Sequence, residues 1–430
     1  MNDPILLGLY RLFSGAFGPW APAALVWREK LRRAKLRPED RARISERLGK
    51  PSSARSPGRL IWLHGADAAD VSVLSPLVDR LSSAGFHVLA TTRGHDSAAL
   101  RLPAGALRQF APLDVPKFVT RFLDHWRPDV VLVAQSEFWP NLIIETNRRG
   151  IPLALVNGKL SARAFLLWRK LPGLLPALLR RFDVCLAQTP EDVGRLMALG
   201  AERSPASGDP IFDFTPAPAD GPSLARFAAR LGARPAWLAL TGDVEEEDIV
   251  IDVHRRVGGQ FPDLLTIIAP RHAKRASGIA LRAAKFGLTA RAGAGNSEGE
   301  ALPQIHIAGG LPEAGLFYRA AGVAFLGKSL CGGGIDPVEA AKLGCAILYG
   351  PDVGDFEAAY AALDSAGGAT RIYDAATLAS ELASLLLDAA ELRAMGRASA
   401  DAAERLGGAS DKIMQALRPY LARAHIEPEA

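Results

Sequence analysis

Cysteine is scarce in this sequence of 430 residues, which contains only Cys185, Cys331 and Cys345. The three lie far apart and form no CxxC pair, which argues against a zinc site and against a disulfide scaffold. Cys185 lies in the apolar run DVCLAQ, so it is expected to be a core residue. The protein is therefore expected in a reducing compartment.

Several other patterns are also missing. No GxGxxG or GxxxxGKS motif occurs where a nucleotide-binding strand would need it, which makes a Rossmann oxidoreductase a poor candidate. The chain has no acidic or basic tail of a disordered kind, and its 49% hydrophobic and 23% charged residues are typical of a globular protein. Its length exceeds one ordinary core, so two domains are expected.

Charge is almost absent from the N-terminal segment. Residues 4–27 contain one charged residue, Arg11, and a run rich in Arg and Lys follows, within a net charge of +5. About twenty apolar residues span a bilayer, but Gly, Pro and Arg11 interrupt the segment, while Trp20 and Trp27 suit the headgroup level. We expect residues 1–50 to form a membrane anchor that spans once or lies in the interface, followed by a basic helix for anionic lipid. The alternative is a hydrophobic first helix buried on the protein itself.

The rest of the chain alternates apolar runs with helical patterns. The β-rich runs of the first half are RLIWLHG, FHVLATT, DVVLVAQS, IPLALVNG and DVCLAQT, and those of the second half are AWLALTG, LLTIIAP, GLTARAG, QIHIAGG, VAFLGKS, AILYG and ATRIYD. Such alternation predicts parallel sheets covered on both faces. Residues 208–223, rich in Pro, Asp and Gly, predict a linker. The fold class is therefore α/β, with doubly wound Rossmann-like domains at 51–210 and 211–430.

Polar residues cluster where the predicted strands end. In the first domain these are His64, Asp67, Asp70, Glu137, Asn157 and Lys159, and in the second they are Arg271, His272, Gly327, Ser329, Gly333, Gly334 and Asp336. Ligands of doubly wound sheets bind beyond the carboxyl ends of the strands, so the sequence predicts a site in a cleft between the domains. For the first loop, IWLHGADAAD at 61–70, an ordinary turn whose Asp caps the next helix remains an alternative.

The polar residues of the second domain suggest a nucleotide. A Gly-rich turn opening a helix presents backbone N–H groups that suit a phosphate, and Glu339, one turn further, is placed to bind ribose hydroxyls. Arg271 and Lys159 are candidate anion-binding residues. The alternative for both is a solvated surface charge.

Several ordered motifs match one family. WLHGADAAD at 62–70, QSEFWPNL at 135–142 and NGKLSARA at 157–164 are similar to its WxHxxSxGE, ETELWPNL and NARLSERS. QTPEDVGRLMALGA, GDPIFD, APRHAKR and GIDPVEAAKLGCAILYGP match further segments. The chain resembles the 3-deoxy-D-manno-octulosonic acid (Kdo) transferases of lipopolysaccharide synthesis, over nearly its whole length. These are GT-B glycosyltransferases, whose N-terminal domain takes the acceptor and whose C-terminal domain takes the donor.

The resemblance implies a specific reaction. Such enzymes transfer Kdo from CMP-Kdo to a lipid A precursor, with inversion and without a bound metal or cofactor, at the cytoplasmic face of the inner membrane. The expected partners are thus CMP-Kdo, the lipid A precursor and membrane lipid, with no nucleic acid. The family's carboxylate base corresponds to Asp70, since inversion needs a base near the acceptor hydroxyl. The last helix is expected to pack back on the N-terminal domain.

This sequence also departs from the family pattern. Asp70 replaces the family's Glu, Asp67 replaces its Ser, and Ile335 and Asp336 replace the His and Asn of its GGHN turn. Three hypotheses remain open on these residues: a Kdo transferase, a paralogue that moves another activated sugar, and a non-catalytic member that binds lipid A precursor or nucleotide.

Overall fold

The computed structural model describes residues 4–18, 20, 43–93, 100, 102–171, 173–216, 220–293, 301–310, 313–330 and 332–426. Most of the predicted basic helix, residues 28–42, and Cys331 lie outside these ranges. The chain divides into two compact units, Met1–Phe214 together with Gly407–Ala430, and Thr215–Leu406. The division falls within the Pro-, Asp- and Gly-rich segment 208–223.

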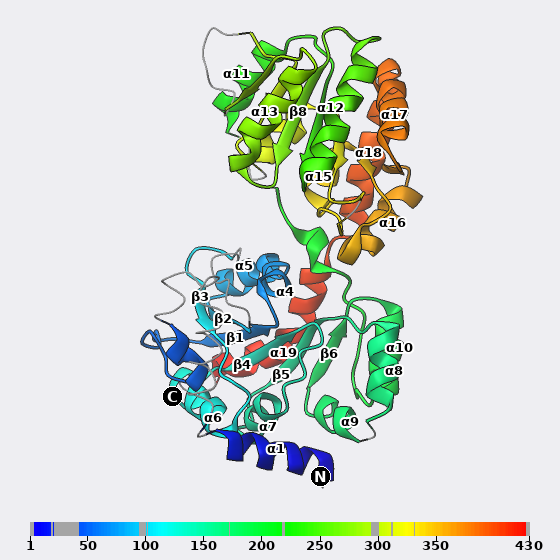
Figure 1. Ribbon diagram of the computed structural model, residues 1–430. Coiled ribbons are helices and arrows are strands. Elements are labelled where there is room, and N and C mark those ends of the chain that lie inside the picture. Colours follow the sequence, from blue (N-terminus) through cyan, green and yellow to red (C-terminus); the bar gives the residue numbers. More distant parts are fainter. Residues whose placement is uncertain are drawn as a thin grey trace. The chain divides into compact units, whose positions relative to one another are not determined.

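The first unit is built on a six-stranded parallel sheet (Figure 1). Its strands are β1 (Leu60–Gly65), β2 (His87–Thr92), β3 (Leu107–Phe110), β4 (Val130–Ala134), β5 (Leu153–Gly158) and β6 (Val184–Ala187). The strand order is β3-β2-β1-β4-β5-β6. From β1 the chain adds β2 and β3 on one side; it then crosses to the other side of β1 and adds β4, β5 and β6 there. The topological switch point, where doubly wound sheets bind ligands, is therefore between β1 and β4.

Helices cover both faces of this sheet. One face carries α6 (Pro116–Trp126), α7 (Pro140–Arg148), α9 (Leu174–Leu179) and α10 (Pro190–Ala198), with α8 (Ala162–Arg169) packed at its margin. The other face carries α4 (Ala68–Ser72), α5 (Ser75–Ser83) and the C-terminal helix α19 (Ala409–Ile426). The N-terminal helix α1 (Ile5–Phe17) lies against α6 and α7, and short 3₁₀ turns η1 (Ile44–Leu48) and η3 (Pro210–Asp213) complete the unit (Figure 1). Because helices fill both faces, the strands are apolar at nearly every position.

The second unit repeats the plan on a seven-stranded parallel sheet. The strands are β7 (Ala236–Thr241), β8 (Leu265–Pro270), β9 (Ala290–Ala292), β10 (Ile305–Ile307), β11 (Val323–Leu326), β12 (Ala346–Tyr349) and β13 (Ala369–Arg371), in the order β13-β12-β11-β7-β8-β10-β9. One face holds α11 (Gly221–Leu231), α14 (Ala314–Ala320), α15 (Val338–Lys342), α16 (Glu357–Ser365) and α18 (Ala389–Arg405); the other holds α12 (Val244–Gly258), α13 (Ala276–Lys285) and α17 (Ala375–Leu387). The 3₁₀ turns are η4 (Ala273–Arg275) and η6 (Gly354–Phe356). Here the switch point lies between β7 and β11.

One strand was not predicted from the sequence. All twelve predicted runs form strands, but β3, with the sequence LRQF, was not among them. It is an edge strand of four residues without a β-branched side chain, and its Arg108 is exposed, so it lacks the apolar run that marks a doubly covered strand. Cys185 is buried in the core as predicted, and burial raises the pKa of its thiol to about 12.

Candidate functional site

Two acids in the loop after β1, Asp67 and Asp70, cap the N-terminus of the short helix α4. Asp67 is the N-cap of α4, and its Oδ1 accepts hydrogen bonds from the backbone N–H groups of Ala69 (2.9 Å) and Asp70 (3.1 Å). The Asp67 N–H in turn donates to Asp70 Oδ2 at 3.4 Å, which completes a capping box. The capping interpretation of this loop is therefore correct for Asp67. It leaves Asp70, half-buried at the switch point of the sheet, with one carboxylate oxygen outside the box.

Asp70 has a perturbed acidity. Its pKa is raised from 3.8 to about 6, first by burial and then by the negative charges of Asp67 and Glu137, against hydrogen bonds from the Asp67 and Ala66 backbone. A carboxyl group with a pKa near 6 is largely ionised at neutral pH yet holds a proton more readily than an ordinary aspartate. This combination suits a general base that must accept a proton during turnover and release it afterwards.

Glu137 reaches the same place from the neighbouring strand. It lies in the loop between β4 and α7, and its Oε2 accepts a hydrogen bond from Trp139 Nε1 at 2.6 Å. The loop turns sharply because Gln135 adopts a left-handed backbone with φ of 57°. Ser136 Oγ donates to the backbone carbonyl of Lys159, which joins this loop to the end of β5. Asp67, Asp70 and Glu137 thus form a carboxylate cluster at the carboxyl ends of β1 and β4.

The end of β5 supplies two residues of different character. Asn157 is buried, has a left-handed φ of 52°, and its Oδ1 finds no partner in the described part of the protein. Lys159 is exposed, and its charge acts to lower the pKa of the nearby Asp209, which burial raises overall. Asp209 also accepts a hydrogen bond from Gln188 Nε2 and caps η3. Sequence reasoning missed both Gln188, which directly follows β6, and Asp209, which lies beyond α10.

The prediction for His64 requires correction. His64 lies inside β1 rather than in the loop, and its side chain is fully buried. Its Nδ1 lies 3.0 Å from Thr91 Oγ1, and its ring meets Trp139 edge-on at 4.7 Å. Burial lowers its pKa to about 3, so the ring is neutral. His64 therefore lies beneath the loops; its Nε2 has no partner among the described residues, and its role in acceptor binding stays a prediction.

The second unit has a small cavity at its own switch point. The cavity measures about 190 Å³ and is lined by Gly242, Arg271, Lys328, Gly334, Ile335, Asp336 and Phe356. Gly242 follows β7, Arg271 follows β8, and Lys328 follows β11, so the carboxyl ends of three adjacent strands contribute to it. Arg271 and Asp336 were predicted site residues and both line this cavity. His272 does not line it; it is exposed and begins η4.

A buried carboxylate that sequence reasoning missed organises this cavity. Glu246, in the first turn of α12, is fully buried, and its Oε2 accepts hydrogen bonds from the backbone N–H of Gly242 (2.8 Å) and of Lys328 (2.6 Å). It thereby fixes the loops after β7 and β11 to each other. Glu246 is one of three consecutive acids, Glu245–Glu247, in the first turn of α12, where negative charge is favourable to the helix dipole. Only the tertiary contacts separate Glu246 from its neighbours.

The Gly-rich turn after β11 is shaped by close packing. A Cβ at Gly327 would lie 2.2 Å from the Leu240 carbonyl oxygen, and one at Gly334, whose φ is 72°, would lie 2.8 Å from that of Val353. Gly333 has φ of 91°, and Lys328 has an unusual left-handed φ of 57°. These glycines permit the turn and the close approach of neighbouring backbone, which is a structural reason for them.

The structure shows where the other predicted residues of this turn lie. Ser329 is fully buried, with its hydroxyl donating to the Leu326 carbonyl (2.6 Å) and accepting from the Gly350 N–H (2.8 Å), so it holds the turn together and is not exposed to a ligand. The helix that follows, α15, has only five residues, and the Val338 N–H in its first turn donates to Asp336 Oδ1 at 2.9 Å. Glu339 lies half-buried in α15, facing Gly315 of α14.

The stretch GVAFLGKS at 322–329 matches the P-loop pattern letter for letter, but it does not form a P-loop. Its four middle residues are strand β11 rather than a phosphate-binding loop. Among the described residues, no group of three or more His, Cys, Asp or Glu side chains is arranged to hold a metal ion.

Two doubly wound parallel sheets, each with its polar residues at the switch point, define the GT-B class of glycosyltransferases and related nucleotide-sugar enzymes. Solved structures agree on the fold. UDP-GlcNAc 2-epimerase from Neisseria meningitidis aligns with a TM-score of 0.55 and 12% identity over 84% of this chain and 100% of that chain. The glycosyltransferase of kitacinnamycin aligns with a TM-score of 0.50 and 16% identity over 84% of this chain and 99% of that one.

Sequence comparison identifies the family. Residues 42–213 match the family model described as 3-deoxy-D-manno-octulosonic-acid transferase (kdotransferase). A probable mitochondrial 3-deoxy-D-manno-octulosonic acid transferase of Arabidopsis thaliana is 30% identical over 93% of this chain and 92% of that protein. The 3-deoxy-D-manno-octulosonic acid transferase of Bordetella pertussis is 30% identical over 86% and 90%. The chain belongs to the Kdo transferase family of glycosyltransferases.

Proposed function

We propose that this protein transfers Kdo from CMP-Kdo to a sugar hydroxyl of a lipid A precursor, with inversion and without a metal ion. The observation that carries the proposal is Asp70, which lies in the family's base position at the switch point of the first sheet. Burial and two neighbouring carboxylates raise its pKa to about 6. Membership of the Kdo transferase family supports CMP-Kdo as the donor.

The reaction follows from these groups. Asp70 accepts the proton of the acceptor hydroxyl while that oxygen forms a bond to the anomeric carbon of Kdo, and the bond from this carbon to the CMP phosphate oxygen breaks. The electron pair leaves with CMP, whose phosphate gains negative charge. Arg271 and Lys328, in the cavity of the second unit, are the cations suited to stabilise that phosphate.

The test is turnover by purified protein with CMP-Kdo and a lipid A precursor, measured by the mass of the lipid product. We expect product with the unmodified protein, undiminished turnover with EDTA, and loss of product in Asp70→Asn while CMP-Kdo still binds. Asp79→Asn, an exposed aspartate on α5, is the matched control and should retain full activity. Donor binding without any turnover in the unmodified protein would instead favour the non-catalytic hypothesis, and turnover only with another activated sugar would favour the paralogue.

We also propose that the protein works at the cytoplasmic face of the inner membrane, with α1 lying in the lipid interface. One side of α1 is fixed to the protein: Leu7 is buried, Tyr10 Oη donates to Asp114 at 2.8 Å, and Arg11 pairs with Glu145 at 2.8 Å. Asn141 Nδ2 donates to Ser14 Oγ at 3.0 Å. Part of the segment thus packs on the protein, as the alternative for residues 4–27 anticipated.

The other side of α1 is exposed and apolar. Ile5, Leu12, Phe13 and Phe17 are 82%, 67%, 69% and 58% exposed. An exposed apolar stripe on a helix that is anchored from behind suits a surface that lies on lipid. The described part of the chain contains no helix long and apolar enough to cross a membrane.

We assign α8 to the same surface through its two exposed leucines. Phe165 and Trp168 pack against the core, and Trp168 meets Phe138 edge-on at 6.1 Å. The exposed residues are instead Leu166 and Leu167, at 56% and 55%. The segment that follows lies close to the start of α1, since a Cβ on Gly173 would be 3.5 Å from the Pro4 ring.

Substitution tests the membrane proposal better than deletion, because removal of α1 would expose the groups that bind it. Leu12→Gln with Phe13→Gln should reduce cosedimentation with vesicles severalfold while leaving the melting temperature unchanged. The control is Leu281→Gln with Leu387→Gln, two residues of the second unit that are 69% and 65% exposed. Equal vesicle binding by both double variants would contradict the proposal.

A further inference from the structure

A second cavity lies in the first unit, at the opposite edge of the sheet from the carboxylate cluster. It measures about 510 Å³, within the usual range of ligand pockets. Its walls come from residues 55–59 before β1, residues 123–129 at the end of α6 and in the loop before β4, residues 149–152 before β5, and Arg423 of α19. Since β1, β4 and β5 have five or six residues, the two edges are roughly 17–20 Å apart. The cavity is therefore separate from the candidate catalytic site.

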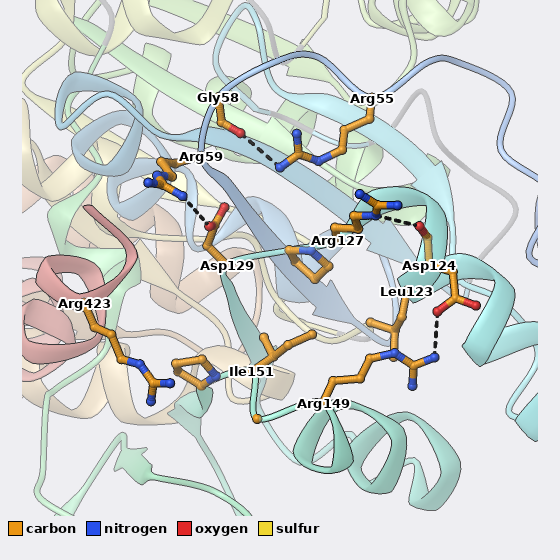
Figure 2. A pocket seen from close by; sticks show the side chains of 13 residues that line it. Arg55, Gly58, Arg59, Leu123, Asp124, Arg127, Asp129, Arg149, Ile151 and Arg423 are labelled. Carbon is orange, nitrogen blue, oxygen red and sulfur yellow. Dashed lines mark hydrogen bonds and ion pairs between the residues drawn. The ribbon is translucent and has the colours of Figure 1, made fainter. Parts of the chain in front are cut away.

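Arginine dominates the lining. Figure 2 shows the side chains of Arg55, Arg59, Arg127, Arg149 and Arg423 around the cavity, with Asp124 and Asp129 as the carboxylates. Five arginines against these two aspartates and Glu145, which lies outside the lining and pairs with Arg149 at 3.2 Å, leave an excess of positive charge. Arg59 pairs with Asp129 at 3.3 Å, and Arg149 pairs with Asp124 at 2.8 Å, so these two acids are already engaged.

A structural role explains some of these arginines but not all. The helices α6 and α7 end at this cavity, and their last carbonyls need donors. Arg55 Nε donates to the Trp126 carbonyl at 2.8 Å, while its other nitrogens donate to Ser56 and Gly58. Arg149 Nη1 donates to the Glu145 carbonyl at 3.1 Å. Arg55 is thus fully used by backbone oxygens, although no carboxylate neutralises its charge in the described residues.

Arg127 is different. Its Nε donates to the Asp124 carbonyl at 3.3 Å, but its two Nη groups have no partner within the described part of the protein, and the side chain is exposed. Its backbone also has a left-handed φ of 40°, at the end of a helix where glycine is the usual residue. An arginine that occupies a glycine position, with its guanidinium fork open toward the cavity, is available for an oxyanion.

We propose that this cavity is a binding site for a phosphate-bearing ligand, with Arg127 as its main contact and Arg55 as a fixed positive charge beside it. The excess of guanidinium groups favours a multiply charged anion, because one carboxylate would leave part of the positive charge uncompensated. Arg423 comes from the C-terminal helix, so a bound ligand links α19 to the segments that precede β1, β4 and β5. The phosphate belongs either to a soluble compound or to a lipid headgroup.

The experiment separates binding from folding through Arg127→Gly. Glycine relieves the left-handed backbone and removes the guanidinium, so this variant should bind poorly yet melt at the same temperature as the unmodified protein or higher. Arg148→Gln is the matched control, because Arg148 is the neighbouring arginine at the end of α7 and does not line the cavity. Inorganic pyrophosphate is the soluble probe, titrated calorimetrically into the full chain.

We expect saturable pyrophosphate binding, a dissociation constant at least tenfold higher in Arg127→Gly, and a change of less than twofold in Arg148→Gln. For a lipid source, the assay is cosedimentation with phosphatidylcholine vesicles with and without phosphatidic acid. If Arg127→Gly loses only the additional vesicle binding that phosphatidic acid gives, the phosphate belongs to a lipid headgroup. If Arg127→Gly loses only pyrophosphate binding, the phosphate belongs to a soluble compound. If neither assay distinguishes Arg127→Gly from Arg148→Gln, the proposal is wrong.

Discussion

The first prediction concerns the pH dependence of turnover and how it changes when a carboxylate next to Asp70 loses its charge. Asp70 has a pKa of about 6, raised from 3.8, so we expect kcat/KM to increase with pH and to level off above about pH 7. At pH 7 this group is about ten parts ionised to one part protonated. Burial is the largest cause of the raised pKa, and the charges of Asp67 and Glu137 come next, in that order.

Two substitutions remove these charges while keeping the hydrogen bonds. Asp67→Asn retains an oxygen that caps α4, because Asn and Asp are comparable N-caps. Glu137→Gln retains an acceptor for Trp139 Nε1. Removing a negative neighbour makes ionisation of Asp70 easier, so its pKa falls and the acid limb of the profile moves to lower pH. We expect a shift of roughly half to one pH unit for Asp67→Asn and a smaller one for Glu137→Gln.

The assay is the rate of CMP release with CMP-Kdo and lipid A precursor between pH 4.5 and 9. Glu191→Gln, an exposed glutamate of α10, is the control and should leave the midpoint unchanged. The midpoint should stay above the ordinary aspartate value in both variants, since burial persists. An acid limb that both variants leave in place, or one that also appears in Asp70→Asn, would show that another group is the base.

Three further predictions concern single residues. Asp70→Asn should lower turnover by roughly 10²-fold or more. Because the folded protein holds the Asp70 proton more tightly than the unfolded chain does, the protonated carboxyl contributes stability at low pH that is lost as pH rises through about 6. The variant should therefore melt higher than the unmodified protein at pH 8 and at about the same temperature at pH 3. Arg271→Ala should raise the dissociation constant of CMP-Kdo at least tenfold by calorimetry, and an unchanged constant would remove Arg271 from the donor site. Glu246→Ala leaves the Gly242 and Lys328 N–H groups without their acceptor and should cost about 3 kcal/mol or more in denaturant unfolding, whereas Glu246→Gln keeps one oxygen for both and should cost less than half of that. Equal losses in the two Glu246 variants would contradict the assigned contacts.

The sequence determined the architecture because its signal is local. Strands covered on both faces must be apolar throughout, so runs such as DVVLVAQS and LLTIIAP marked twelve strands, while the edge strand β3 carried no such run. The sequence also determined the family, through motifs that occur in order along the chain. It placed Asp67, Asp70 and Glu137 at strand ends, and parallel strands bring such ends to one edge of a sheet.

Only the tertiary structure decided what each polar side chain contacts. His64 and Ser329 have the same sequence signature as their site neighbours, yet both are buried and engaged inside the protein. Glu246 looked like one acid among three, but its carboxylate joins two loops. On α8, one residue of rotation separates the packed Phe165 from the exposed Leu166. Burial and hydrogen-bond partners depend on segments distant in sequence, as does the arginine cavity, whose walls span residues 55 to 423. A local sequence pattern contains no information about partners that are distant in the sequence, so only the tertiary structure shows what these residues contact.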